Sequence, residues 1–142
     1  MTLNNKLSIG FIGLGSLGEG LCNSLVKAGC PVAVTDLKRA NADRLIAAGA
    51  VWSDDVKGVC ANADVVITVL PSPAISRKVV EGVDGVLAHL REGGVWIEMS
   101  TTDLEDLKRL AAKAAERGIS VLECPVTGGV HLANSGEITV LV

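Results

Sequence analysis

The chain has 142 residues, of which 49% are hydrophobic and 20% are charged. This is the length and composition of one globular domain with a sizeable core. Thirteen basic and sixteen acidic residues give a net charge of −3, and no basic run is longer than the pair Lys38-Arg39. These values argue against nucleic acid or an anionic membrane surface as the main partner. No apolar run reaches the length needed to span a membrane.

The four cysteines, Cys22, Cys30, Cys60 and Cys124, show no CxxC spacing and no pairing with histidine at zinc-binding distances. We therefore predict no metal site and expect reduced thiols. Lys6 is followed at once by an apolar run, a beginning that does not resemble a signal peptide. Together these features favour a cytoplasmic location.

The first structured segment joins a short apolar run to a glycine motif. Residues 7–12 are apolar enough for a buried strand. The motif G-x-G-x-x-G follows directly, at Gly13, Gly15 and Gly18. In a dinucleotide-binding turn, the first glycine permits the tight turn and the second lets the backbone approach a diphosphate. The third glycine lets the helix lie close to the strand.

The residues after this motif supply the context that it requires. Apolar side chains repeat every four residues over 16–28, which predicts a helix that ends at Gly29. A second strand is predicted over 31–35, and Asp36 follows it, 18 residues after Gly18. This is the place where an acid that binds ribose hydroxyls is expected. The alternative, a glycine-rich turn without a ligand, does not account for Asp36.

The rest of the chain alternates helices and strands at the spacing of βαβ units. We predict helices over residues 38–48, 54–61, 73–81, 83–89 and 104–118, and strands over 50–52, 65–70, 95–99, 119–122 and 138–142. The strand over 65–70 is apolar on both faces, which favours the middle of a parallel sheet.

Local signals also predict how several helices begin. We expect Ser53 to cap the helix over 54–61, and Ser72 followed by Pro73 to begin the next helix. Thr102 begins a capping-box pattern, T-x-x-E. We expect Gly128 and Gly129 to lie in a loop.

These elements predict an α/β fold: a doubly wound, mostly parallel Rossmann sheet with helices on both faces. Residues 1–142 then form one dinucleotide-binding domain. The sequence stops inside the apolar run 138–142, which is typical of a truncated chain and not of a natural C-terminus.

Four blocks of sequence resemble the β-hydroxyacid dehydrogenases, the group that contains 3-hydroxyisobutyrate dehydrogenase and tartronate semialdehyde reductase, in the 6-phosphogluconate dehydrogenase superfamily. The first block is the glycine motif in residues 10–18. Residues 70–73 resemble that family's loop against the cofactor, and 98–102 resemble its D-x-S-T segment. Residues 123–129 resemble its D-A-P-V-S-G-G substrate loop.

The chain also departs from the family pattern. Glu98 and Glu123 replace aspartate, Cys124 replaces alanine and Thr127 replaces serine. The resemblance further implies a catalytic lysine and an all-helical C-terminal domain, both beyond residue 142. We therefore assign no catalytic residue within this chain and expect little or no turnover from it alone.

The resemblance implies hydride transfer between a nicotinamide cofactor and a small 3-hydroxy acid, of the 3-hydroxyisobutyrate or tartronate semialdehyde type. Thr127, Gly128 and Gly129 would then bind the substrate carboxylate; the alternative for them is an ordinary loop turn. The cofactor-binding residues that we predict are Gly13, Leu14, Gly15, Ser16, Leu17, Gly18, Asp36, Leu37, Leu70, Pro71 and Thr101. Thr101 could instead cap backbone groups, and Pro71 could simply end a strand.

Asp36 favours NAD over NADP. A carboxylate accepts hydrogen bonds from ribose hydroxyls, whereas a 2′-phosphate would face a repulsion of roughly 4 kcal/mol per pair of unit charges at 4 Å and an effective dielectric of 20. Lys38 and Arg39 could offset that repulsion, although a solvated helix start is the better interpretation of both. We therefore predict NAD, with NADP as the alternative.

Other side chains and other functions offer alternatives to this interpretation. His131 could reach a cleft and Cys124 could be reactive, but a loop residue and a small buried group are the simpler interpretations. An imine or ketone reductase, or a non-catalytic nucleotide-binding or scaffolding module, would share the cofactor domain.

An exposed edge at the final strand favours a homo-oligomer, for example a dimer formed by edge pairing or strand exchange.

Overall fold

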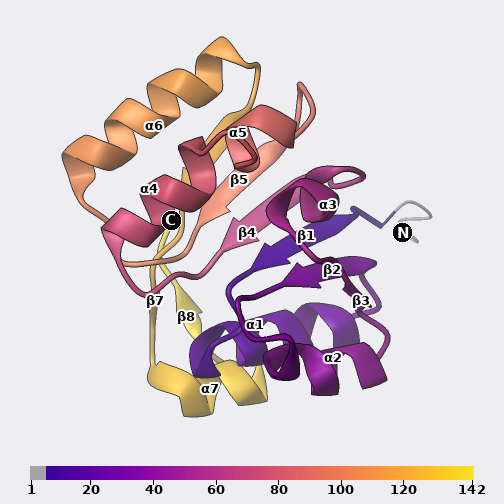
Figure 1. The fold of residues 1–142 in the computed structure, drawn as a ribbon. Helices are drawn as coiled ribbons and strands as arrows, with labels where there is room; N and C mark the ends of the chain where they lie inside the picture. The colour runs from indigo at the N-terminus through magenta and orange to yellow at the C-terminus, as the bar shows by residue number, and fades with distance from the viewer. Residues whose placement is uncertain (1–5) are drawn as a thin grey trace.

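A computed structural model describes residues 6–142, so residues 1–5 of the predicted domain lie outside the described residues. Six parallel strands form one sheet in the order β3-β2-β1-β4-β5-β6 (Figure 1). Their bounds are β1 Ile9–Ile12, β2 Val32–Thr35, β3 Val51–Trp52, β4 Val65–Thr68, β5 Val95–Glu98 and β6 Ser120–Glu123. The predicted doubly wound Rossmann fold is confirmed, with the apolar strand β4 inside the sheet.

The register brings the carboxyl ends of five strands to one level. Ile12 of β1 pairs with Thr35 of β2 and with Thr68 of β4, Thr68 pairs with Glu98 of β5, and Glu98 pairs with Glu123 of β6. The strand order reverses at β1 and β4, where an open α/β sheet forms its binding crevice. Segments that follow these strands therefore meet at one edge of the sheet.

Helices cover both faces of the sheet (Figure 1). Helices α3 (Val56–Cys60), α4 (Pro73–Glu81), α5 (Val86–His89) and α6 (Leu104–Glu116) supply the apolar cluster on one face, around the fully buried Trp96. Helices α1 (Ser16–Lys27), α2 (Asp43–Ala47) and α7 (Gly129–Ser135) cover the other face, around the fully buried Phe11. No helix within residues 6–142 combines the length and apolarity needed to cross a membrane.

Glycines allow α1 to lie against the end of β1. Gly13 has a φ of +98°, and a Cβ atom there would lie 2.1 Å from the carbonyl oxygen of Val69. A Cβ atom on Gly18 would lie 2.0 Å from the carbonyl oxygen of Gly13. The tight turn at Gly13 and the close packing at Gly18 agree with the roles predicted for these two glycines.

The C-terminal segment differs from the prediction of a loop at Gly128 and Gly129. Gly128, with a φ of +122°, is the N-cap of α7, so the glycine pair begins a helix. Strands β7 (Val126–Thr127) and β8 (Thr139–Val140) pair antiparallel, as a separate two-stranded sheet. Helix α7 forms because its apolar side packs on α1, a tertiary contact that has no local sequence signal.

Two predicted helix caps were wrong by one or two positions. Asp55, not Ser53, caps α3 by accepting a hydrogen bond from the Gly58 amide at 2.7 Å. Asp103, not Thr102, caps α6 by accepting from the Asp106 amide at 2.9 Å. A carboxylate competes well with a neighbouring hydroxyl for these amides because charge-assisted hydrogen bonds are stronger. The predicted helix over 38–48 is also divided, into a 3-10 turn (Arg39–Ala42) and α2.

Candidate functional site

The N-terminus of α1 offers backbone amides to open space. Gly15 is its N-cap and provides no side-chain cap, whereas side chains cap α3, α4 and α6. A Cβ atom on Gly15 would meet no atom within 4 Å, in contrast with the crowding at Gly13 and Gly18. Free N–H groups and the positive end of the helix dipole suit an anion at such a place. The residues present therefore fit the diphosphate of a dinucleotide.

Asp36 lies beside this glycine turn, directly after β2. One carboxylate oxygen accepts the backbone N–H of Leu14 at 2.7 Å. The other accepts the backbone N–H of Lys38 at 2.8 Å and the side-chain amide of Asn41 at 3.1 Å. These bonds fix the orientation of the carboxylate next to the turn, while its side chain stays partly accessible. Asn41 was not predicted, because no local motif marks its contact with Asp36.

The other predicted cofactor-binding residues near the glycine turn and Asp36 differ in their exposure to solvent. Leu14 is 1% exposed and its amide is bonded to Asp36, so it acts by holding Asp36. Ser16 is exposed and Leu17 half-buried at the start of α1. Leu37 is fully exposed next to Asp36, a position that suits contact with a flat apolar group.

The second half of the predicted site follows β4 and β5. Pro71 and Thr101 are exposed, and Leu70 is half-buried. The amide of Leu70 donates to the Ser100 hydroxyl at 2.7 Å, so the segments after β4 and β5 are joined directly. Ser100 was not among the predicted site residues, although it belongs to the same D-x-S-T-like block as Thr101.

The predicted substrate residues lie at the start of α7. Thr127, Gly128 and Gly129 are all exposed. Helix α7 packs along α1 in the same direction: a Cβ atom on Gly20 would lie 2.5 Å from the side chain of Asn134, and one on Gly136 would lie 3.5 Å from that of Ser24. Both helices therefore begin at the same end of the pair, which places residues 127–129 on the side of the glycine turn (Figure 1).

The cysteines and histidines contribute little to this edge of the sheet. Burial raises the pKa of Cys22 and of Cys60 to about 12, and Glu19 adds to the effect at Cys22. Burial and the neighbouring Glu123 also raise the pKa of Cys124, which keeps its thiol protonated. His131 lies exposed on α7, so the reactive roles weighed for it and for Cys124 gain no support.

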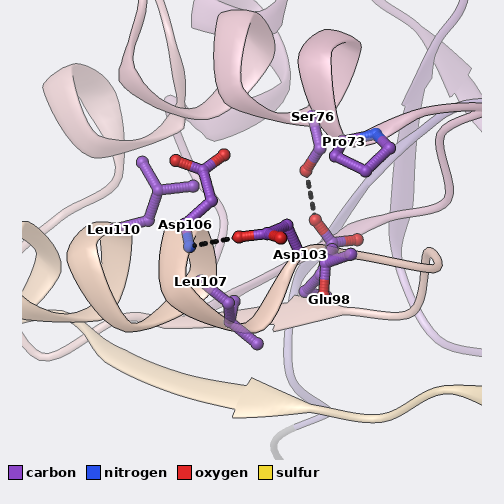
Figure 2. Close-up of a pocket in the computed structure, with 8 residues that line it drawn as sticks. Pro73, Ser76, Glu98, Asp103, Asp106, Leu107 and Leu110 are labelled. Atoms are coloured by element: carbon purple, nitrogen blue, oxygen red, sulfur yellow. Dashed lines mark hydrogen bonds between the residues drawn. The ribbon is translucent and has the colours of Figure 1, made fainter.

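A small cavity lies between α4 and α6, beside the segment that follows β5 (Figure 2). Its volume of about 10 Å³ is that of a single water molecule, too small for a substrate. It is lined by the fully buried Glu98, by Thr102 and by Ser76 of α4. The Thr102 hydroxyl is buried with no hydrogen-bond partner among the described residues. The cavity is therefore not the predicted site.

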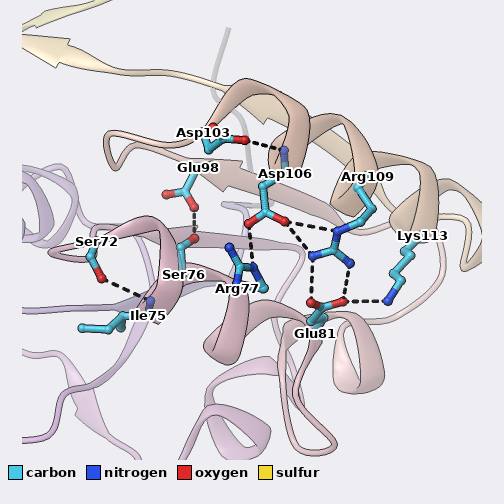
Figure 3. Close-up of polar contacts among 10 residues, drawn as sticks. All are labelled: Ser72, Ile75, Ser76, Arg77, Glu81, Glu98, Asp103, Asp106, Arg109 and Lys113. Carbon is cyan, nitrogen blue, oxygen red and sulfur yellow. Dashed lines mark hydrogen bonds and ion pairs between the residues drawn. The ribbon is translucent and has the colours of Figure 1, made fainter.

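Ion pairs join α4 to α6 on the outer side of this cavity (Figure 3). Arg109 contacts Glu81 through two hydrogen bonds, at 2.7 and 2.8 Å, and Lys113 contacts the same carboxylate at 2.6 Å. Asp106 bonds both Arg77 and Arg109. These contacts fix α4 relative to α6 independently of the polar groups beneath them.

The Glu81 ion pairs predict a specific loss of stability in acid. Hydrogen bonds from Arg109 and then Lys113 lower the pKa of Glu81 from 4.5 to about 2. The stabilisation is therefore complete above about pH 4.5 and is lost as the pH falls towards 2. We expect Glu81→Gln to cost about 1 kcal/mol at neutral pH and to flatten the pH dependence between these values. Urea denaturation at a series of pH values measures both effects.

Glu105 provides a matched control on α6. Its side chain is 81% exposed and, within residues 6–142, pairs only with Lys108, at 3.1 Å. Glu105→Gln should leave the pH dependence of unfolding unchanged. An equal change in the two variants would contradict a special role for the Glu81 pairs.

The parallel sheet, the glycine turn at its switch point and the acid after β2 define a dinucleotide-binding Rossmann domain. Residues 8–142 match the family described as the NAD binding domain of 6-phosphogluconate dehydrogenase, and the chain belongs to this family. The family resemblance and the nicotinamide cofactor predicted from the sequence are thereby confirmed.

Three relatives illustrate the match. The chain is 35% identical over 140 residues to 2-(hydroxymethyl)glutarate dehydrogenase of Eubacterium barkeri, covering 99% of this chain and 46% of that protein. It is 37% identical over 134 residues to NAD-dependent L-serine dehydrogenase of Pseudomonas aeruginosa, covering 94% and 45%. The structure of Mycobacterium tuberculosis 3-hydroxyisobutyrate dehydrogenase with L-serine superposes with a TM-score of 0.87 at 32% identity, covering 96% and 46%. The chain thus spans about half the length of these relatives.

Proposed function

We propose that this chain is the cofactor-binding part of an NAD-dependent dehydrogenase that acts on a small 3-hydroxy acid. The observation that carries the proposal is the shared edge of the sheet, where the uncapped start of α1, Asp36 and the segments after β4 and β5 meet. The similarity to dehydrogenases of hydroxylated acids supports this substrate class. Substrates of the 3-hydroxyisobutyrate or tartronate semialdehyde type follow from the family resemblance.

Each part of this edge has a distinct task in the proposal. Bound nicotinamide supplies the hydride chemistry. The amides at the start of α1, around Gly15, hold the diphosphate. Asp36, oriented by Leu14 and Asn41, accepts hydrogen bonds from ribose hydroxyls, which favours NAD over NADP. Leu70, Pro71 and Thr101 line the nicotinamide half.

Thr127, Gly128 and Gly129 would bind the substrate carboxylate through a hydroxyl and backbone amides. All three are exposed and lie on the side of the glycine turn. We assign no acid or base for proton transfer among the 142 residues, so efficient turnover requires a group supplied from elsewhere. We further propose a cytoplasmic homo-oligomer, because all four cysteines are free and the apolar residues 140–142 are exposed.

The test is a titration of NADH fluorescence with this chain, followed by the same titration with Asp36→Ala. Loss of the carboxylate that bonds the ribose should weaken NADH binding about tenfold, and should narrow the preference for NADH over NADPH. Lys57→Ala, on the surface of α3, is the control. Absence of NADH binding by the wild-type chain would refute the proposed function. Assays with 3-hydroxyisobutyrate and tartronate semialdehyde then measure the residual turnover.

A further inference from the structure

Glu98 is a carboxylic acid buried at the carboxyl end of β5 without a cationic partner among the described residues. Its side chain is 0% exposed, and no Lys, Arg or His within residues 6–142 pairs with it. Its oxygens instead accept the Thr68 hydroxyl at 3.0 Å, the Ser100 amide at 2.9 Å and the Ser76 hydroxyl. Figure 2 shows the bond from Ser76. Burying a carboxyl group is costly, so a buried one that is held by three donors and no cation calls for a reason.

The hydrogen bonds around Glu98 have a fixed direction. The indole N–H of Trp96 donates to the Thr68 hydroxyl at 2.9 Å, which leaves the Thr68 proton to donate to Glu98. The Ser100 amide also donates to Glu98, so the backbone of Ser100 is held in place. The Ser100 hydroxyl then accepts the Leu70 amide at 2.7 Å. The network thus connects Glu98 to two backbone segments that we predict to line the nicotinamide half: the one after β5, at Ser100, and the one after β4, at Leu70.

Docking of α4 does not by itself explain this network. The contact between Ser76 and Glu98 does tie α4 to β5. However, α4 is already tied to α6 by the pairs of Glu81 with Arg109 and of Arg77 with Asp106 (Figure 3). What Glu98 adds is the link through Ser100 to Leu70.

We propose that Glu98 is a positioning residue for the nicotinamide half of the site, acting through Ser100 on the segments that carry Leu70, Pro71 and Thr101. This inference rests on the proposed function and extends it. The diphosphate and the adenosine half lie at α1 and Asp36, outside this network. The network therefore affects the binding of the nicotinamide half and leaves that of the adenosine half unchanged.

Two ligands isolate the contribution of the nicotinamide ring: NADH, and ADP-ribose, which keeps the diphosphate and both riboses but lacks the ring. Ser100→Ala removes the hydroxyl that accepts the Leu70 amide and donates to the Thr68 carbonyl oxygen at 3.5 Å. Glu98→Met fills a similar volume without an accepting oxygen. We expect both variants to bind NADH at least fivefold more weakly and ADP-ribose within twofold of wild type. Glu98→Gln keeps an oxygen for Ser100 and can donate to Ser76, so it should stay within twofold for both ligands. Glu81→Gln removes ion pairs that lie outside the network. It should lower the stability of the protein but leave the ratio of NADH affinity to ADP-ribose affinity unchanged.

Amide hydrogen exchange supplies a measurement without any ligand. Exchange at Leu70 should be at least tenfold faster in Ser100→Ala and Glu98→Met than in wild type. Exchange at Val69, whose amide donates to the Ile12 carbonyl at 3.0 Å, should not change. If Glu98→Met does not fold, Ser100→Ala alone tests the proposal, through amide exchange at Leu70 and the ratio of NADH affinity to ADP-ribose affinity.

The outcomes distinguish this inference from the function on which it rests. If wild type binds neither NADH nor ADP-ribose, both fail. If wild type binds both ligands but the variants weaken the two equally, or leave Leu70 exchange unchanged, the proposed function stands and the positioning role of Glu98 is overturned.

Discussion

Gly15→Ala should leave the fold intact and reduce the affinity for NADH at least tenfold, which is about 1.4 kcal/mol. Gly15 has a φ of −62° and a ψ of −178°, which alanine adopts without strain, and its Cβ atom would meet nothing within 4 Å. The same open space lies against the first amides of α1, where the proposed site holds the diphosphate. A methyl group there would occupy the place of the ligand.

Circular dichroism and urea denaturation should show a free energy of unfolding within about 1 kcal/mol of wild type, since only the N-cap residue changes. NADH and ADP-ribose should weaken together, because both carry the diphosphate. Gly49→Ala is the reciprocal control. The φ of +116° at Gly49 makes alanine strained there, but Gly49 follows α2 and is not one of the residues of the proposed site. That variant should lose stability and keep its affinity. Unchanged NADH binding by Gly15→Ala would argue against a diphosphate at this turn.

The sequence was sufficient to predict the order and type of the main elements, and to predict that the proposed site lies at the carboxyl edge of the sheet. Apolar periodicity is a property of each segment, so β4 could be placed inside a parallel sheet from its residues alone. The glycine spacing and Asp36 could be interpreted together because the turn and the strand that precedes Asp36 are local structures. The observed contact between Asp36 and the Leu14 amide is the tertiary consequence of that spacing.

What the sequence did not predict depends on contacts between distant segments. Helix α7 needs the surface of α1, and its glycine-rich start is as typical of a loop as of a helix. Asp103 and Thr102 are both good N-cap residues, and the choice between them depends on which one the packing buries. Likewise, nothing in residues 98–102 shows that Ser100 accepts the Leu70 amide 30 positions earlier. Glu98, which differs from the family's aspartate, became interpretable only once its three donors were known.

Gly18→Ala should be the most destabilising of the substitutions considered. The new Cβ atom would lie 2.0 Å from the Gly13 carbonyl oxygen and 3.6 Å from the ring of Phe11. The first contact is with backbone, so no side chain can rotate away to relieve it, and α1 must move from β1. Because α1 also carries α7, that movement disturbs the packing of both helices. We expect a loss of about 3 kcal/mol, which for a domain of this size lowers Tm by roughly 10 °C.

Thermal and urea unfolding of Gly18→Ala, measured beside Gly15→Ala, test this account of the motif. The two glycines are three positions apart, and the substitution is the same, yet one should reduce stability and the other only ligand affinity. The difference follows from what each Cβ atom would meet: the backbone of Gly13 in one case and open space in the other. Equal stability of the two variants would show that α1 does not depend on contact with the turn, and the placement of the diphosphate site would lose its structural basis.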